Sequence, residues 1–184
     1  MGLLEGRVAV VTGSGRGIGR AFAMAMAAAG AKVVVNDVGA TLDGAGSGED
    51  PAARVCDEIR AAGGEAVPNH DSVSDFDAAR GIVASAVESF GRLDILVNNA
   101  GIVRDRTLVK MTEVDFDAVL AVHLKGSFNC AHHAGGVMRE AGYGQGYRYV
   151  HNDPAAREEM RKRKATAIQS SAIGFPSSPR RYRP

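Results

Sequence analysis

A glycine-rich turn near the start of the chain is the segment best suited to bind an anionic ligand. Residues 12–19 read T-G-S-G-R-G-I-G and join an apolar run to a predicted helix. Gly13 allows a tight turn, while Gly17 and Gly19 let the backbone approach a pyrophosphate and let the helix pack closely. The first helical turn also offers unpaired N–H groups to phosphate oxygens. The segment predicts a phosphate site, although a merely tight strand–helix connection would use similar residues.

Two charged residues bear on which nucleotide this turn would accept. Asp37 lies 18 residues after Gly19, directly after a second apolar run. A carboxylate there can accept hydrogen bonds from ribose hydroxyls and would repel a 2′-phosphate, which favours NAD. Arg16, inside the turn, would instead favour the 2′-phosphate of NADP. We expect NAD, with NADP as the alternative, and note that an aspartate in a loop can also simply cap a turn.

Apolar runs alternate with helical patterns through most of the chain. Short strands are expected at 7–12, 32–36, 66–67 and 93–97. Helices are expected at 17–29, from Pro51 to the glycines at 63 and 64, from Ser74 to 90, and from Thr112 onward. Asp50 before Pro51, Ser74, and Thr112 with Asp115 are the expected N-caps, and Gly91 is an expected helix stop. This order predicts an α/β fold with a doubly wound parallel sheet and ligands at the carboxyl ends of the strands.

Composition excludes several classes of protein. The 184 residues are 45% hydrophobic and 23% charged, which is unlike a disordered or a membrane protein. The longest apolar stretch, at 22–29, is far shorter than the ~20 residues of a membrane span. Residues 1–6 resemble no signal peptide. Cys56 and Cys130 have neither metal-type nor disulfide-framework spacing, so we expect a cytoplasmic protein without a metal site.

The near-neutral net charge hides two unlike regions. Residues 1–145 hold 13 basic and 18 acidic side chains, a net of −5, and residues 146–184 hold 9 basic and 3 acidic side chains, a net of +6. We expect a nucleotide-binding domain at 1–145 and an atypical, basic, largely disordered tail at 146–184. The basic charges of the tail are dispersed and lie beside Glu158 and Glu159, so nucleic acid is not expected as a partner.

The glycine turn, together with Asn98-Asn99-Ala100-Gly101 after the fourth strand, resembles the short-chain dehydrogenase/reductase family over residues 4 to about 145. The stretch V-V-V-N-D-V-G and residues 101–108 (G-I-V-R-D-R-T-L) look most like the branch that includes (3R)-hydroxyacyl-CoA dehydrogenase domains of multifunctional β-oxidation enzymes. The resemblance implies a Rossmann-type sheet that here is truncated after the fourth strand and the following helix. It also implies homo-oligomers in the family, which we do not assume for this chain.

The resemblance carries over a set of cofactor-binding residues. Asp71 is expected beside the adenine, although Asp71 and Ser72 also suit a turn or a helix start. The segment from Asn98 to Gly101 is expected to stabilise the centre of the sheet and to line the nicotinamide ribose, although Asn-Asn-Ala-Gly by itself is also a plausible turn. His123 stands where the family usually has asparagine; it could orient water in a proton relay or be an ordinary helix histidine with one satisfied nitrogen. The expected cofactor-binding residues are Gly13, Ser14, Arg16, Gly17, Ile18, Gly19, Asp37, Asp71, Ser72, Asn98, Ala100 and Gly101.

The proton donor of the family is not found in this sequence. Its members use a Tyr-x-x-x-Lys pair and a serine, and no tyrosine here has a lysine four residues later. Ser171 and Tyr182 faintly resemble the serine and tyrosine, but no lysine follows, so no catalytic residue is assigned. A frameshift near codon 145, alternative splicing or a genuinely divergent terminus would each produce such a tail, and translation of the other frames would separate them.

These observations predict an NAD(P)-dependent oxidoreductase that transfers hydride between a nicotinamide cofactor and an alcohol or carbonyl substrate. An acyl thioester of the 3-hydroxyacyl-CoA type is one such substrate. This chain alone is expected to lack the Ser/Tyr/Lys catalytic residues and therefore to be inactive. The alternative is a non-catalytic dinucleotide-binding protein.

Overall fold

Four parallel strands form the centre of the fold. In this computed structural model, which describes residues 2–40 and 50–141, the strands are β1 (Val8–Thr12), β2 (Lys32–Asn36), β3 (Ala66–Asn69) and β4 (Ile95–Val97). Their order across the sheet is β3-β2-β1-β4. The predicted parallel α/β sheet is therefore confirmed.

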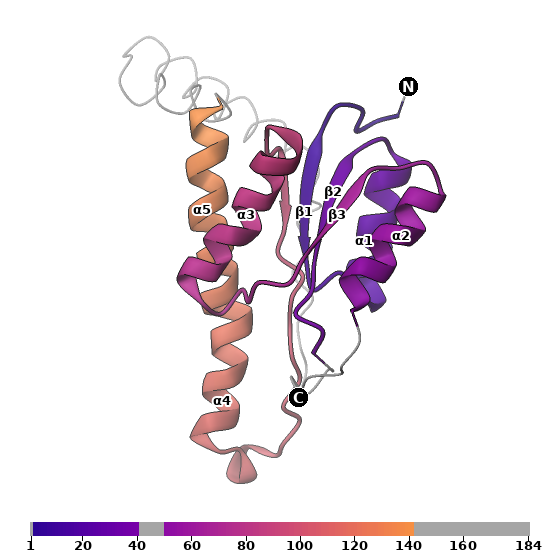
Figure 1. Ribbon diagram of the computed structural model, residues 1–184. Helices are drawn as coiled ribbons and strands as arrows, with labels where there is room; N and C mark the ends of the chain where they lie inside the picture. The colour runs from indigo at the N-terminus through magenta and orange to yellow at the C-terminus, as the bar shows by residue number, and fades with distance from the viewer. Residues whose placement is uncertain (1, 41–49, 142–184) are drawn as a thin grey trace, which may run out of the picture. The chain divides into compact units, whose positions relative to one another are not determined.

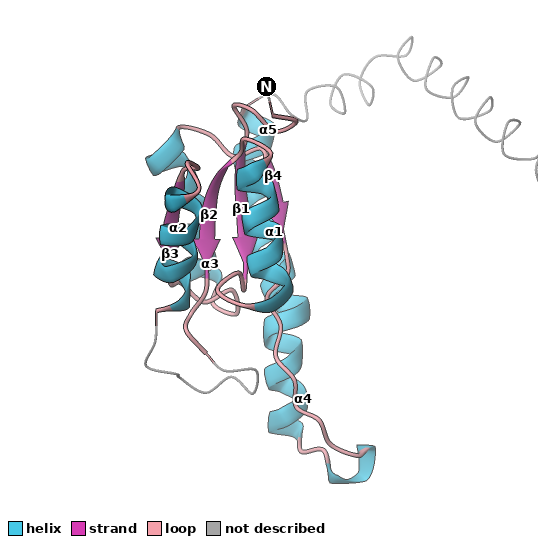
Figure 2. Cartoon of the chain, turned by 90° about the vertical axis from the view of Figure 1, so that its right-hand side faces the viewer, coloured by secondary structure: helices cyan, strands magenta, loops and turns pink. Residues whose placement is uncertain are grey.

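The register of the sheet brings the ends of the strands together. Thr12 pairs with Asn36, Asn36 pairs with Asn69, and Val11 pairs with Val97. All four carboxyl ends consequently lie at one edge, where the arrowheads point in Figure 2. This is the edge at which open α/β sheets bind ligands.

Helices cover both faces of the sheet. Helices α1 (Gly17–Ala28) and α2 (Pro51–Ala61) pack on one face, and α3 (Phe76–Phe90) and α5 (Gly126–Glu140) pack on the other (Figure 1). Between β4 and α5 the chain forms the short 3₁₀ turn η1 (Leu108–Lys110), then α4 (Glu113–Leu120) and the π-helical segment η2 (Ala121–Lys125). The last two run directly into α5, so residues 113–140 form one continuous helical arm.

The central strands are buried on both sides, which explains their unbroken apolar sequence. Val33 and Val35 belong to a core shared with α1 and α2, while Val34 belongs to a second core shared with α3 and α5. All three valines are 0% exposed. Successive side chains of β2 therefore pack in two separate cores, one on each face of the sheet.

Most of the predicted helix ends are confirmed. The Asp50 carboxylate accepts from the Ala53 N–H before Pro51, Gly91 ends α3 at a φ of 78°, and Thr112 and Asp115 form the predicted capping box. The prediction of Ser74 as a cap is wrong, because the Asp75 carboxylate accepts from the Ala78 N–H instead.

The fourth strand is shorter than predicted. It begins at Ile95 rather than Leu93, because Asp94 donates its N–H to the Val8 carbonyl oxygen but accepts the Val8 N–H with its side chain instead of its backbone. The Asp94 carboxylate accepts from the Val8 N–H at 2.9 Å, and from the guanidinium groups of Arg7 and Arg92.

Some predictions concern residues outside those that the structure describes. They are the boundary at 145/146, the character of the tail, Ser171, Tyr182 and most of the glycine-rich insert at 39–50. Among the helices that the structure describes, none has the length and apolar character needed to span a membrane.

Candidate nucleotide-binding site

A partly open pocket lies at the carboxyl ends of β1, β2 and β4. Its volume of about 430 Å³ falls within the usual ~300–1,000 Å³ of small-molecule sites. The glycine turn forms one wall, the end of β2 another, and the segment after β4 a third. The lining residues are Gly13, Arg16, Gly17, Ile18, Gly19, Asn36, Asp37, Val38, Ala40, Ser72, Val73, Asn99, Ala100, Gly101, Ile102 and Val122.

Two glycines of the turn are required by close backbone approach. A Cβ at Gly13, whose φ is 62°, would lie 2.7 Å from the Cα of Ala100. A Cβ at Gly19 would lie 2.2 Å from the Gly13 carbonyl oxygen and 2.4 Å from Nδ2 of Asn99. These distances are too short for any side chain, so the turn depends on both glycines.

The third glycine differs because it faces open space. Gly17 has a φ of 54°, and a Cβ there would meet nothing within 4 Å. It is the first residue of α1, and that helix has no acidic side chain in its first turn. Free N–H groups, positive helix polarity and an uncrowded approach together fit a pyrophosphate.

Thr12 and Asn99 fasten the turn to the end of β4. The buried Thr12 hydroxyl accepts from the backbone N–H groups of Asn99 and Ala100, each at 3.0 Å. The Asn99 amide donates back to the carbonyl oxygens of Thr12 and Gly13 at 2.9 and 3.0 Å. Thr12 was not assigned to the site from sequence, and Asn99 was assigned only as part of the segment from Asn98 to Gly101.

Asp37 is held at the outer end of the pocket by backbone amides. One carboxylate oxygen accepts from the Gly15 N–H and the other from the Gly39 N–H, both at 2.9 Å. Arg16 lies at the same end, with a guanidinium nitrogen 3.2 Å from the Ala40 carbonyl oxygen. The structure therefore places both residues that bear on the choice between NAD and NADP around the same part of the pocket.

Three of the predicted residues do not line the pocket. Ser14 is buried, and its hydroxyl donates to the Val11 carbonyl oxygen at 2.6 Å. The Asp71 carboxylate accepts from the Asn69 amide at 2.9 Å and lies against Gly81 of α3. The Asn98 amide points to the Ser127 carbonyl oxygen of α5 at 3.4 Å. These residues support the loops of the site, and their direct contact with a cofactor stays a prediction.

The structure adds several pocket residues that the sequence did not indicate. Asn36 is 2% exposed, and its amide donates to the Asn69 side-chain oxygen at 2.8 Å and to the Asp71 carbonyl oxygen at 2.9 Å. It thereby joins the loops after β2 and β3. Its place at the end of a predicted strand was the available signal. The other additions are Val38, Ala40, Val73, Ile102 and Val122.

His123 holds the segment that follows β4. Its Nε2 lies 3.1 Å from the Ile102 amide nitrogen and 2.9 Å from the Ile102 carbonyl oxygen. A Cβ on Gly101 would come within 2.6 Å of Cε1 of this ring, so Gly101 makes room for it. The contact favours the interpretation as a satisfied, positioning histidine; a role in a proton relay stays a prediction.

The two cysteines are buried and free, and neither lines the pocket. Burial raises the pKa of both the Cys56 and the Cys130 thiol to about 11. Across residues 2–40 and 50–141, no group of three or more His, Cys, Asp or Glu side chains is placed to hold a metal ion.

Comparison with known sequences points to one family. The model of the family described as short chain dehydrogenase matches residues 7–145. The chain is 54% identical over 141 residues to a peroxisomal multifunctional enzyme type 2 of Drosophila melanogaster, covering 77% of this chain and 23% of that protein. It is 45% identical over 141 residues to a hydroxyacyl-CoA dehydrogenase of Mycobacterium tuberculosis, covering 74% of this chain and 42% of that one.

Comparison with solved structures gives the same result. A short chain dehydrogenase from Mycobacterium avium superposes with a TM-score of 0.70 at 57% identity, covering 76% of this chain and 50% of that chain. The chain thus spans between about a quarter and a half of the length of these three relatives.

Proposed function

We propose, from the premise that this chain belongs to the short-chain dehydrogenase family, that its glycine turn binds the pyrophosphate of NAD. The observation that carries this proposal is the turn itself. It combines two backbone approaches that only glycine allows with the open N-terminus of α1. Such an arrangement suits a phosphate group, which needs N–H donors and a close, uncrowded approach.

The preference for NAD over NADP rests on Asp37. Its carboxylate is fixed by the Gly15 and Gly39 amides at the outer end of the pocket. An anion fixed there would accept hydrogen bonds from ribose hydroxyls and repel a 2′-phosphate. Arg16 supports the opposite preference, but its guanidinium already donates to the Ala40 carbonyl oxygen.

The reaction that we propose is hydride transfer between the cofactor and the hydroxyl or carbonyl carbon of a small molecule. A bound nicotinamide supplies the hydride acceptor or donor, and the residues of this chain bind and orient it. Relatives named as hydroxyacyl-CoA dehydrogenase and peroxisomal multifunctional enzyme favour an acyl thioester as the substrate. Ala100, Gly101 and Ile102 form the wall next to which such a substrate would lie.

We further propose that this chain alone binds the cofactor without turnover. No tyrosine in its sequence is followed four residues later by a lysine, so the usual proton donor of the family is missing. The same observation favours the second candidate function, a non-catalytic dinucleotide-binding protein. Both candidates share the cofactor site and differ only in whether a catalytic part is supplied elsewhere.

Titration of the purified 184-residue chain with NADH and NADPH, followed by nicotinamide fluorescence, tests these proposals. We expect NADH to bind about 10-fold more tightly, because a close like-charge contact is worth on the order of 1.4 kcal/mol. The variant D37N should reduce this preference, whereas D57N, an exposed carboxylate on α2 paired with Arg60, should not. Binding of neither nucleotide would contradict the site, and tighter binding of NADPH would contradict the role of Asp37.

Activity measurements separate the remaining claims. With NAD and a 3-hydroxyacyl-CoA, the chain should form no NADH. Turnover by the pure chain would show that its catalytic group lies outside the Tyr-x-x-x-Lys pattern and would contradict the proposed inactivity.

For the location we propose a reducing compartment, with the cytoplasm as the first expectation. Both cysteines are free and buried, which suits such a compartment. Several relatives are named as peroxisomal, so the peroxisome is the alternative. Microscopy of the tagged chain in its own cells distinguishes the two.

A further inference from the structure

The segment that leads from β4 through η1 carries three cationic side chains just beyond the nucleotide pocket. Ile102 is the last residue of this segment that lines the pocket, and Arg104, Arg106 and Lys110 follow it. The chain runs from there away from the sheet to η1 (Figure 2). Cations that stand beside a ligand pocket attract an anionic part of the ligand.

These three cations form no ion pair within residues 2–40 and 50–141. Other basic side chains in the same part of the chain do pair with a carboxylate. They include Arg7, Arg20, Lys32, Arg60, Arg80 and Arg92. The cations after Ile102 therefore keep their charge available for a ligand.

Arg104 also has a hydrogen-bond donor without an acceptor. Its Nε atom is buried, and none of the residues that the structure describes accepts from it. A buried donor left in this way is costly, and an oxygen that meets it recovers the lost free energy. A guanidinium group donates in a flat fork that matches two oxygens of a phosphate. A phosphate oxygen is therefore a suitable acceptor for Arg104.

The acidic side chains near the two arginines do not neutralise them. The Asp115 carboxylate accepts from the Thr112 hydroxyl at 2.8 Å and from the Thr112 N–H at 3.4 Å. Asp105 offers Arg106 only its backbone carbonyl oxygen, at 3.1 Å. Hydrogen bonds from Thr112, and then the charges of Arg106 and Arg104, lower the pKa of Asp115. The arginines thus stabilise a nearby anion without being paired to it.

We propose that Arg104 and Arg106 bind the phosphate groups of a coenzyme A thioester. This inference rests on the proposed function, in which an acyl thioester lies beside the wall that ends at Ile102. At ~3.6 Å per residue, the backbones of Arg104 and Arg106 lie within roughly 7 and 14 Å of Ile102. The pantetheine arm of coenzyme A is long enough to join a thioester in the pocket to phosphates at these arginines.

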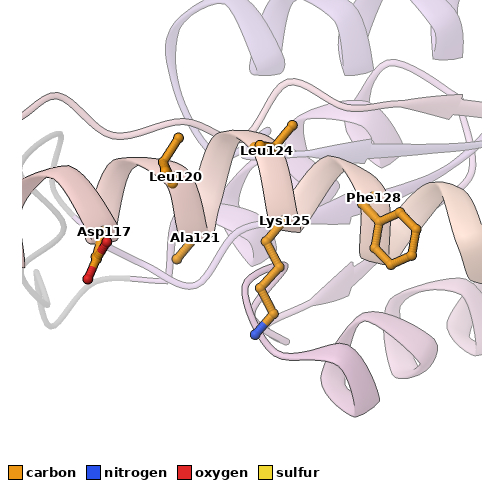
Figure 3. A pocket seen from close by; sticks show the side chains of 6 residues that line it. All are labelled: Asp117, Leu120, Ala121, Leu124, Lys125 and Phe128. Atoms are coloured by element: carbon orange, nitrogen blue, oxygen red, sulfur yellow. The ribbon is translucent and has the colours of Figure 1, made fainter.

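The shallow groove on the arm is less suited to the phosphates. It has a volume of about 490 Å³ and is lined by Asp117, Leu120, Ala121, Leu124, Lys125 and Phe128 (Figure 3). Most of these side chains are apolar, and Asp117 would repel a phosphate that Lys125 attracts. Lys125 is therefore the matched control for the two arginines.

Isothermal titration calorimetry of the 184-residue chain, saturated with NADH, tests this assignment. The probes are acetyl-coenzyme A and acetyl-pantetheine, which share the thioester and differ in the phosphates and the nucleoside. Saturating NADH keeps the nucleoside out of the nucleotide pocket. The unchanged chain should bind acetyl-coenzyme A about 30-fold more tightly than acetyl-pantetheine.

The arginine variants should remove this preference. R104Q should weaken binding of acetyl-coenzyme A about 10-fold, and R106Q, at a more exposed side chain, about threefold. Binding of acetyl-pantetheine should not change. R104K, which keeps the charge without the fork, should fall between R104Q and the unchanged chain. K125Q should bind both probes as the unchanged chain does.

Circular dichroism and NADH titration control folding, and these substitutions should leave both unchanged. Equal affinity for the two probes in a chain that binds NADH would overturn the role of the arginines and leave the nucleotide site intact. An equal loss in K125Q and R104Q would also overturn it, because the groove would then hold the phosphates. So would inorganic pyrophosphate that binds as tightly as acetyl-coenzyme A, since the site would not be specific for the thioester. A chain that does not bind NADH would contradict the proposed function itself.

Discussion

Two regions of the molecule differ in how fully their side chains are packed. At the centre of the sheet, every residue of β1 and β2 except Lys32 is buried, with the core shared with α1 and α2 on one face and the core shared with α3 and α5 on the other. At the edge of the sheet, all three residues of β4 are only half-buried, and in the arm neither α4 nor η2 contains a buried residue. Of the arm, Val122 alone lines the nucleotide pocket. The pocket therefore depends mainly on the packed centre of the fold.

Because the pocket depends on the closely packed part of the fold, we expect the largest effect of a substitution in the glycine turn. In the variant G19A, the new Cβ would lie 2.2 Å from the Gly13 carbonyl oxygen, so the turn or α1 must move. We expect the free energy of unfolding to fall by about 3 kcal/mol and NADH binding to be lost. Urea unfolding and fluorescence titration measure the two effects.

A helical glycine in the arm is the matched control for Gly19. A Cβ at Gly135 of α5 meets nothing within 4 Å, so G135A should keep NADH binding and raise stability by up to about 1 kcal/mol. If G19A and G135A behaved alike, the turn would not be closely packed and its role in the site would be lost.

The next largest effect is expected at Thr12. The variant T12V leaves the N–H groups of Asn99 and Ala100 without their acceptor in a buried place. We expect the free energy of unfolding to fall by about 2 kcal/mol, measured by urea unfolding. T107V, at an exposed threonine that caps η1 without a side-chain hydrogen bond, should change it by less than about 0.5 kcal/mol. Equal effects would mean that the hydrogen bonds from the Asn99 and Ala100 N–H groups to the Thr12 hydroxyl contribute nothing to stability.

A smaller effect is expected at the helix caps, one of which lies in each region. The Ala53 N–H, and then His70, hold the pKa of Asp50 below its ordinary value of 3.8. D50A should lower the free energy of unfolding by about 1 kcal/mol at pH 7. A carboxylate with a lowered folded-state pKa stabilises the fold above its unfolded-state pKa. The difference between D50A and the unchanged chain should therefore shrink as the pH falls below about 4 toward the lowered value.

The matching cap in the arm should behave differently. Hydrogen bonds from Thr112 lower the pKa of Asp115, but α4 packs no buried residue. D115A should increase hydrogen exchange over residues 113–120 and leave global unfolding unchanged.

The control for the Asp50 cap of α2 is D50N. This variant keeps the hydrogen-bond acceptor without its charge, so it should retain stability and lose the pH dependence. A D50N variant as pH-sensitive as the unchanged chain would exclude Asp50 as the titrating group.

The sequence predicted the parts of this molecule that depend on neighbouring residues in the chain. The strand ends at Thr12 and Asn36, the proline-led start of α2 and the capping box at Thr112 all follow from local rules. So does the turn at Gly13, Gly17 and Gly19, because the eight residues at 12–19 contain both its glycines and the start of its helix.

The features that could not be predicted from the sequence depend on contacts between residues that are far apart in the chain. Asp71 points to Asn69 and Gly81 rather than into the pocket, and only the packing of α3 against the loop after β3 decides this. The start of β4 moved to Ile95 because Asp94 binds β1 across 86 residues of sequence. The role of Asn99 was not predicted for the same reason, since its side-chain amide donates to the carbonyl oxygens of Thr12 and Gly13, which are far from it in the sequence.

The smallest predicted effect concerns the two buried thiols, one on each side of the sheet. Cys56 packs in the core with α1 and α2, and Cys130 packs in the core with α3 and α5; both are 0% exposed, and burial raises the pKa of each to about 11. Modification by a thiol reagent at pH 8 should therefore be slow at both and should require opening of the structure. Because η2, the segment directly before α5, contains no buried residue, Cys130 should react about threefold faster than Cys56. The rates are read separately in C56S and C130S. Equal rates, matching that of global unfolding, would show that the two sides open as one unit, and the contrast between them would then be confined to their surfaces.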